Sequence, residues 1–267
     1  MQSATRRRAL FKLPWIALAA LAMVAPAAAQ VSDLSRGFII INGGFQPLTS
    51  QFSESVTFTD SGGVYTDLLS GAAAHEESTF DGAYSVATGL VYDGSGGVRI
   101  WRSIGLGVGV SRYTLDGSSR VSARVPHPIF FGRDRSISGT IPLTRNETAV
   151  HLQALAIVPA TRSLTVTLFG GPTFFTVEQD LVTDVRFTHA YPYDAAEFSE
   201  AMTASQSNSK IGFNVGADIA YYFSDHVGIG WLTRYSEATV GLPSVGGGAV
   251  SVQAGGLHTA GGLRLRF

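Results

Sequence analysis

The mature part of this chain has no cysteine and almost no lysine, and its apolar residues never form a long run. Without cysteine, disulfides, thiolate metal sites and thiol nucleophiles are excluded. Lys210 is the only lysine after residue 29. No apolar run reaches the roughly 18 residues that indicate a membrane-spanning helix, yet the mean hydropathy is positive, at +0.19. We therefore expect no membrane-spanning helix. The apolar residues must belong to a different kind of fold.

The first 29 residues have the pattern of a secretory signal peptide. Arg6, Arg7, Arg8 and Lys12 are followed by the short apolar run 13–24 and by small residues at 27–29. This order of cationic, apolar and small residues predicts cleavage before Gln30. The segment 7–12 also resembles a twin-arginine export signal. The expected organisation is a cleaved leader at 1–29 and one domain at 30–267.

The charge of the mature chain excludes one class of partner. The leader holds four of the 19 lysines and arginines, which leaves 15 against 20 aspartates and glutamates, a net charge of −5. This mild acidity argues against nucleic-acid binding.

Alternation of apolar and small or polar residues is the main positive signal. In segment 104–110, Ile and Leu or Val alternate with glycine, and in 227–235 apolar residues alternate with Gly228, Gly230 and Arg234. Such period-2 alternation places one residue set on each face of a strand, and a membrane strand needs about 9 to 11 residues. Eight segments show the pattern: 37–46, 84–100, 104–110, 150–158, 164–177, 211–223, 227–235 and 250–267.

The connections between these segments alternate between short and long, which is the second signature of an outer-membrane barrel. Short turns are predicted at 102–103, 159–162 and 224–226, and long polar loops at 47–83, 116–148, 178–209 and 241–249. The prediction is an all-β, antiparallel, up-and-down transmembrane barrel of eight strands. The short turns face the periplasm and the long loops face outward. Segment 52–59 could add a further pair, which would make ten strands.

The last strand connects this pattern to a family. Leu263, Leu265 and Phe267 share one face, and Arg264 and Arg266 share the other. Together with the leader and with Phe213–Asp218 leading into Tyr221–Phe223, this resembles bacterial outer-membrane β-barrel domains of the small, eight-stranded OmpA/OmpX type. The resemblance implies an outer-membrane location. We also expect a monomer and no cofactor.

The same resemblance also bears on assembly and on the cell wall. It implies that Leu263, Leu265 and Phe267 form the signal read by the barrel-assembly machinery. We expect no peptidoglycan-binding module of the kind that two-domain relatives carry, and we expect outer-membrane lipid as a constant partner.

Six charged residues have the parity of the barrel interior. They are Asp93, Arg99, Asp218, Arg234, Arg264 and Arg266. Because the lumen of an eight-stranded barrel is filled by side chains and buried charges require partners, these residues predict a polar plug of ion pairs. A narrow path that prefers anions is the alternative, since arginines outnumber carboxylates in the set.

Aromatic residues fall into two groups. The first is expected to form an interfacial girdle: Trp101, Tyr221, Phe223, Trp231, Tyr235 and Phe267. The second lies in the predicted loop 178–209, where Phe187, His189, Tyr191 and Tyr193 are candidates for recognition of a surface ligand. Alternatively, these loop aromatics pack over the barrel mouth as a lid.

No pattern of catalytic residues is present in the sequence. None of the six histidines is followed two positions later by serine, as in lipid A deacylase barrels, and Asp225 and His226 are adjacent, unlike the acids and Asp-x-His of omptin-type proteases. The histidines lack metal-ligand spacing, so no metal is expected. We predict a non-enzymatic protein with a structural or surface-interaction role through its loops, or alternatively a narrow porin-like channel for small solutes.

Overall fold

Antiparallel strands make up nearly all of the chain that the structure describes. The computed structural model describes residues 36–47, 50–59, 65–66, 73–74, 77–86, 88–127, 129–130, 133–244 and 247–267. The predicted leader therefore lies outside the described residues. Within these ranges, no helix is long and apolar enough to cross a membrane. The strands are β1 (Gly37–Gln46), β2 (Ser50–Thr59), β3 (Tyr65–Thr66), β4 (Ala73–Ala74), β5 (Glu77–Val86), β6 (Gly89–Trp101), β7 (Ile104–Pro126), β8 (Asp134–Pro159), β9 (Leu164–Thr188), β10 (Glu197–Tyr222), β11 (Val227–Pro243) and β12 (Ala249–Arg266).

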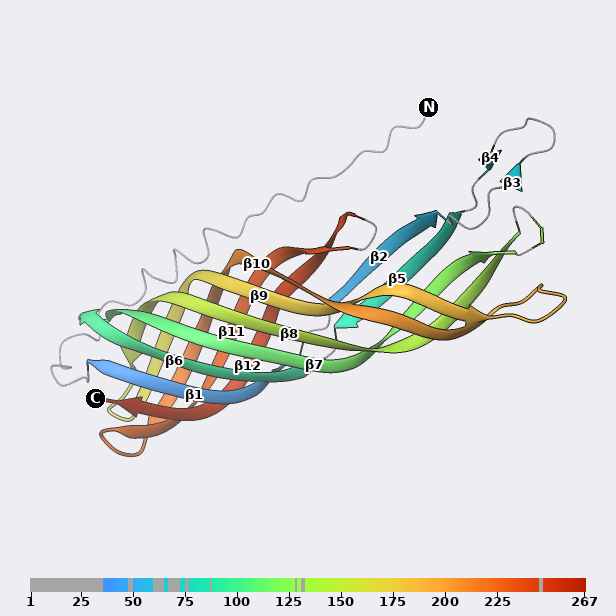
Figure 1. Cartoon of the computed structure of the whole chain (residues 1–267). Helices are drawn as coiled ribbons and strands as arrows, with labels where there is room; N and C mark the ends of the chain where they lie inside the picture. The colour runs from blue at the N-terminus through green and yellow to red at the C-terminus, as the bar shows by residue number, and fades with distance from the viewer. Residues whose placement is uncertain are drawn as a thin grey trace, which may run out of the picture. The chain divides into compact units, whose positions relative to one another are not determined.

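Eight of these strands close into a ring, which confirms the predicted barrel (Figure 1). The order around the ring is β7-β6-β1-β12-β11-β10-β9-β8, and β8 pairs with β7 again. The first and last ring strands meet between Phe38↔Arg266 and Phe45↔Thr259. Every neighbour is antiparallel, and each pair in the order except β6–β1 and the closing β1–β12 contact joins strands that are consecutive in sequence.

β2 and β5 account for the ten-strand alternative without enlarging the ring. They pair with each other, and β5 then pairs with residues 120–124 of β7, beyond the point where β6 ends its pairing with β7 at Thr114. The predicted strand 84–100 consequently divides, because Tyr84 belongs to β5, while Leu90 and the residues after it belong to β6. The sequence pattern could not reveal this division, since both halves keep the same alternation.

The outer face of the ring carries a continuous apolar band. On β7, for example, Ile104, Leu106, Val108 and Val110 are each about half exposed. The predicted girdle residues all lie on this outer face and are exposed as well. The band comprises Ile39, Ile41, Val98, Ile100, Ile104, Leu106, Val108, Val110, Leu152, Phe174, Ile211, Phe213, Val215, Ile219, Tyr221, Ile229, Trp231 and Leu263.

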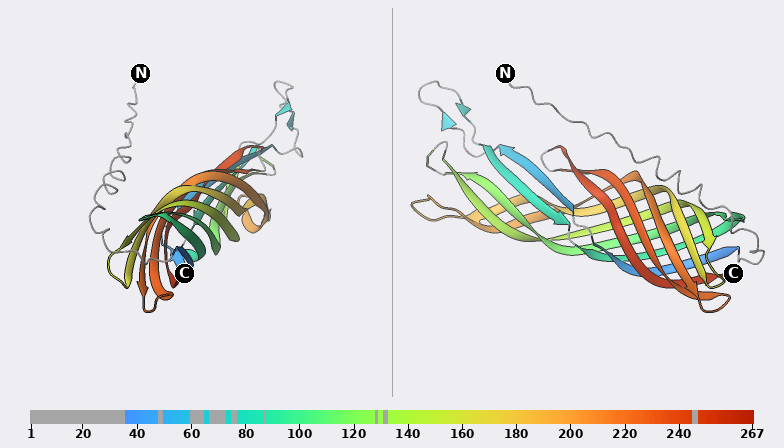
Figure 2. Two further views of the ribbon diagram at one scale, coloured as in Figure 1. Left: turned by 90° about the vertical axis from the view of Figure 1, so that its left-hand side faces the viewer. Right: turned by 180° about the vertical axis from the view of Figure 1, so that it is seen from behind.

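The strands β7 to β10 are much longer than a bilayer requires. They contain 23, 26, 25 and 26 residues, which at 3.3 Å per residue is roughly 80 Å of strand, whereas about 9 to 11 residues cross a membrane. The long segments after Asp116 and after Glu178 are thus largely strand rather than irregular loop. Figure 2 shows these strands continuing away from the ring.

Beyond the apolar band the ring opens into two parts, which we call the extension. One part is the sheet of β2, β5 and the far ends of β7 to β10; the other is the end of the β11–β12 hairpin, residues 238–254. The parts separate because β10 pairs with β11 only up to Phe213↔Glu237 and β12 pairs with β1 only up to Thr259.

An apolar core joins the two parts of the extension. Its buried side chains come from the sheet and from the hairpin, so the hairpin end packs across the sheet. Val240, Leu242 and Val252 are fully buried there. The core comprises Phe80, Tyr84, Val121, Ala123, Val125, Ile137, Ile141, Leu143, Ala149, Phe175, Val177, Leu181, Val182, Ala238, Val240, Leu242, Val250, Val252 and Ala254.

A substitution at Leu242 tests whether the extension is a packed structure. Leu242→Ala removes a fully buried side chain, and large-to-small changes of this kind cost about 2–5 kcal/mol of unfolding free energy. We expect proteolysis of the extension at lower urea concentration while the ring stays protected in lipid vesicles. Leu106→Ala is the matched control, because lipid replaces the lost contacts there. Equal sensitivity of the two variants would contradict a packed extension.

Candidate functional site

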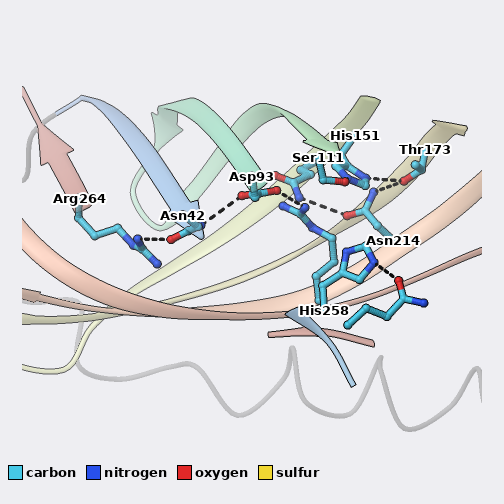
Figure 3. Close-up of polar contacts among 11 residues, drawn as sticks. Asn42, Asp93, Ser111, His151, Thr173, Asn214, His258 and Arg264 are labelled. Atoms are coloured by element: carbon cyan, nitrogen blue, oxygen red, sulfur yellow. Dashed lines mark hydrogen bonds and ion pairs between the residues drawn. The ribbon is translucent and has the colours of Figure 1, made fainter. Parts of the chain in front are cut away.

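Hydrogen bonds in the interior of the ring join Arg264 to Asn42 and Asn42 to Asp93 (Figure 3). With the ion-pair partners of Asp93 and Arg264, the chain links five strands. Asn42 on β1 donates from Nδ2 to Oδ1 of Asp93 on β6, at 3.2 Å. Asp93 also forms a buried ion pair with Arg234 of β11. Both side chains are about 1% exposed, so water does not reach this pair. The sequence predicted that Asp93 and Arg234 belong to a polar plug of ion pairs, and the structure places these two charges in contact.

A second ion pair extends the chain toward the other side of the ring. Arg264 of β12 donates from Nε to both carboxylate oxygens of Asp218 on β10, each at 3.1 Å. Its Nη1 donates to Oδ1 of Asn42 at 2.6 Å, which joins the two pairs. Arg264 is fully buried. The two arginines and two carboxylates balance in charge, which offsets much of the cost of burying each alone.

Uncharged polar side chains fill the lumen beside the ion pairs. The ring of His151 on β8 contacts Ser111 Oγ through Nε2 and Thr173 Oγ1 through Nδ1, both at 2.9 Å. Asn214 donates to the same Thr173 oxygen at 2.8 Å and accepts from Gln153 at 3.3 Å. All of these residues are buried. Arg234 also faces the ring of Phe169, 5.4 Å from its centroid, and its Nε and Nη2 have no hydrogen-bond partner among the described residues.

The polar lumen ends at an ion pair on β8 where the apolar core of the extension begins. Arg145 Nη2 lies 2.6 Å from Glu147 Oε1, and both side chains are buried. Glu147 accepts a hydrogen bond from the backbone N–H of Gly255 at 2.8 Å, and Arg145 donates to the carbonyl oxygen of Gln253. Gly255 has a φ of +85°, a conformation that glycine adopts freely. The pair therefore ties β8 to an edge of β12 that no longer pairs with β1.

The structure thus brings together four of the six predicted lumen residues. Asp93, Asp218, Arg234 and Arg264 lie in one hydrogen-bonded chain. Arg266 instead lies at the ring's short-turn end, where its Nε donates to the carbonyl oxygen of Asp225 at 2.8 Å and its guanidinium covers the Tyr222 ring. Arg99 is half-buried near the same end.

Sequence reasoning missed several members of the interior network. Asn42 was hidden because the run Ile39–Ile41 obscures the parity of β1. Arg145 and Glu147 fell in a predicted loop, although they share the parity of His151 on the same strand, and that shared parity was the available signal. Their partners on β12 are backbone atoms, which no side-chain pattern can indicate.

The polarity of the ring decides its environment. The outside is apolar and exposed, whereas the inside holds buried polar and charged side chains beside a small apolar cluster of Leu155, Phe169 and Leu232. This is the inverse of a water-soluble barrel. A closed ring satisfies every strand's backbone without water, which is what a bilayer demands. The protein is a transmembrane β-barrel.

Comparisons with known proteins give remote structural likenesses. No protein-family model and no curated protein match the sequence. The barrel is similar to the outer membrane protein OprG from Pseudomonas aeruginosa, with 13% identity over 88% of this chain and 97% of that one and a TM-score of 0.43. It is also similar to Neisserial surface protein A (12%, 88% and 99%, TM-score 0.40) and to the outer membrane protease OmpT from Escherichia coli (11%, 90% and 100%, TM-score 0.45). Likenesses this remote carry no argument about function.

The second predicted site lies at the far end of the extension, in the turn between β9 and β10. The ring of His189 lies between those of Phe187 and Tyr193, with centroid distances of 5.6 and 5.2 Å. The ring centroids of Tyr191 and Tyr193 are 5.9 Å apart. Arg135 of β8 donates from Nη1 to the carbonyl oxygen of Tyr193 at 3.1 Å and lies 3.3 Å from His189 Nδ1. The four predicted residues are thus brought together, and a buried arginine of another hairpin holds them.

Exposure divides this aromatic cluster. Phe187 packs partly against the apolar core, as the lid alternative required, whereas Tyr191 is 83% exposed. Ile129 and Phe130, in the turn between β7 and β8, are also more than half exposed. We call Ile129, Phe130 and Tyr191 the tip residues. No group of three or more metal-ligating side chains occurs in the part of the chain that the structure describes.

A latch of polar groups holds the β2–β5 hairpin to the rest of the extension. Glu54 of β2 accepts hydrogen bonds from Tyr84 Oη at 2.9 Å and from Ser244 Oγ at 2.6 Å. Burial raises the pKa of the Tyr84 hydroxyl, and the Glu54 charge raises it further. The hydroxyl therefore remains a donor throughout the physiological pH range, and the latch joins β2, β5 and the end of β11.

Breaking one lumen ion pair tests the role of the interior network. Asp218→Ala leaves Arg264 buried without its carboxylate, and removal of one partner from a buried pair typically costs about 3–5 kcal/mol. We expect the midpoint of urea unfolding in lipid vesicles to fall accordingly. The double variant Asp218→Leu with Arg264→Leu should recover part of the loss, because no lone charge remains. Asp225→Ala, which changes an exposed carboxylate, is the control. If Asp218→Ala unfolded at the same urea concentration as Asp225→Ala, the stabilising role of the buried pair would be contradicted.

Proposed function

We propose that this outer-membrane barrel is a non-conducting, non-catalytic protein that presents a rigid extracellular binding surface. The observation that carries the proposal is the contrast within the extension. Its interior is a packed apolar core, yet its tip exposes Ile129, Phe130 and Tyr191 to solvent. Exposed aromatic side chains on a rigid support lose little entropy on binding and commonly anchor partners.

The support for a binding role is geometric. Arg135 joins the two hairpins that bear the tip residues through its bonds to Tyr193 and its contact with His189. Tyr193 has a φ of +71°, a costly conformation for a residue other than glycine, which surrounding contacts must maintain. The β9–β10 turn that bears Tyr191 is therefore ordered in advance of binding. Its ligand would be a surface molecule of the environment or of another cell.

The proposed protein reaches the membrane by export and assembly. A leader at 1–29 would be cleaved, and Leu263, Leu265 and Phe267 would be read by the barrel-assembly machinery. In support of the latter, Leu263 and Phe267 face outward at the end of β12, and the backbone of Phe267 pairs with that of Gly37. The barrel would act as a monomer.

Substitution of the tip tests the proposal. The triple variant Ile129→Ser, Phe130→Ser and Tyr191→Ser should lose at least tenfold in binding to a panel of immobilised polysaccharides and glycoproteins, since each anchor residue is typically worth about 1 kcal/mol or more. Tyr191→Phe keeps the aromatic ring and should bind as the unmodified protein does. Heat-dependent gel mobility, which reports a closed barrel, should be unchanged in both variants. Binding by the triple variant at full strength would refute the role of the tip.

The channel alternative makes the opposite prediction for conductance. Arg234 and Arg264 are buried, as are the uncharged residues around them, and their charges are matched by Asp93 and Asp218. We therefore expect correctly inserted protein to give no discrete current steps in a planar bilayer. Reproducible steps whose ion selectivity shifts on Arg234→Ala would establish the channel instead.

A further inference from the structure

Arginine residues gather at the short-turn end of the barrel. Arg36, Arg102 and Arg162 are exposed there, and Arg99 and Arg266 are half-buried. Among the described residues of the three short turns and the strand ends beside them, Asp225 is the only acidic residue. This end is therefore cationic, although the mature chain carries a net negative charge.

Two of these arginines lie on one side of the rim, at the ends of β1 and β6. The carbonyl oxygen of Arg36 accepts a hydrogen bond from the backbone N–H of Arg99 at 2.8 Å, which places the start of β1 beside the end of β6. In the turn that follows β6, the Arg102 guanidinium lies 5.3 Å from the ring centroid of Trp101. Neither Arg36 nor Arg102 has a carboxylate partner within the described ranges. Trp101 itself is 62% exposed.

A shallow apolar groove begins on the outer face next to these arginines. It has a volume of about 730 Å³, is bordered by Val98, Leu106 and Phe267, and extends across β8 and β9 to Ala154 and Gly170. Two side chains of the barrel interior, Phe38 and Gln153, also line it. A second groove, of about 340 Å³, continues it between Ile41 and Val110. The two share Gly96 and Val108, so they form one depression, which we call the β6 groove.

Missing side chains create the β6 groove. A Cβ at Gly94 would meet no atom within 4 Å, so this outward position is empty space rather than a packing contact. Gly37 has the opposite property, because a Cβ there would lie 2.5 Å from the ring of Phe267. The absent side chain lets that ring lie across β1 and form the rim of the groove.

The arginines and the groove are contiguous. Val98 is the partner of Gly37 in the β1–β6 register, and Arg36 directly precedes Gly37. From Leu106 to Val110 the groove follows β7 for roughly 13 Å at 3.3 Å per residue. It therefore runs from the charged rim into the apolar band.

We propose that this surface binds an anionic diacyl phospholipid, with the phosphate at Arg36 and Arg102 and one acyl chain in the β6 groove. The bilayer supplies the occupant, since the groove lies within the lipid-facing band. Its apolar walls alone cannot select a ligand, because neighbouring lipid chains are as apolar as the protein. Selection comes from the arginines, each of which favours an anionic lipid surface about fivefold. Tyrosine- or tryptophan-lined rims hold such headgroups at the interface, and Trp101 has that position.

Tryptophan fluorescence can read this site directly. Trp101 and Trp231 are the only tryptophans after residue 29, and they lie on different strands of the ring, β6 and β11. In the Trp231→Phe variant, Trp101 alone reports on the site. We expect brominated phosphatidylglycerol, diluted into phosphatidylcholine vesicles, to quench Trp101 at a several-fold lower fraction than brominated phosphatidylcholine does. Trp101→Phe, in which Trp231 reports, should show no such preference.

Charge variants test whether the arginines cause the preference. Arg36→Gln with Arg102→Gln should abolish most of this several-fold preference, whereas Arg36→Lys with Arg102→Lys should retain most of it. Equal quenching by the two lipids in the Trp231→Phe protein would overturn the proposal. Loss of the preference on adding excess inorganic phosphate would also overturn it, because it would identify a site for free phosphate rather than for lipid.

A paired glycine substitution tests the acyl-chain part. Gly94→Leu fills the β6 groove. Gly43→Leu adds the same side chain at an outward position of the neighbouring strand β1, where a Cβ would likewise meet no atom within 4 Å. Native mass spectrometry of the protein purified with phosphatidylglycerol should show several-fold less retained lipid for Gly94→Leu and unchanged retention for Gly43→Leu. Equal retention in the two variants would refute acyl-chain binding in the groove.

Discussion

The whole structure depends on the requirement that backbone polar groups in a bilayer find partners within the chain. Lipid offers no hydrogen bonds, so a sheet in the membrane must close and leave no free edge. Here closure is made by β1 and β12, which pair from Phe38↔Arg266 to Phe45↔Thr259. The parts of the strands that extend beyond the membrane are free of this requirement. The sheet then separates between β10 and β11 and between β1 and β12, where water can satisfy the exposed edges.

Closure with eight strands also dictates the interior. Such a ring is just wide enough for side chains to fill it, so every inward residue is a neighbour of several others. The charges on β6, β10, β11 and β12 consequently form two balanced pairs connected by Asn42. Above them the Arg145–Glu147 pair closes the polar layer, and the interior becomes apolar. The change of polarity along one lumen separates a membrane-embedded anchor from a packed structure outside it.

The two ends of the molecule accordingly have different surface chemistry. The far end carries exposed apolar and aromatic residues on paired hairpins, tied together by Arg135. The short-turn end carries arginines with few acidic neighbours, next to a groove formed by outward glycines. A surface ligand and a membrane lipid would thus engage opposite ends of the same barrel, with the buried polar network of the ring between them.

The sequence by itself determined the strand pattern, the ring of eight and the identity of the main buried charges. These follow from period-2 alternation, which depends on each residue and its near neighbours alone, and which is strong in segments such as 104–110 and 227–235. Tertiary structure decided what depends on register between distant strands. It divided 84–100 between β5 and β6, turned predicted loops into the extension, and joined Asn42 to Arg264 across 222 positions. It also matched Arg145 and Glu147 to backbone atoms of β12. Alternation specifies the face on which a side chain lies, whereas its partner depends on how the closed ring aligns one strand against another.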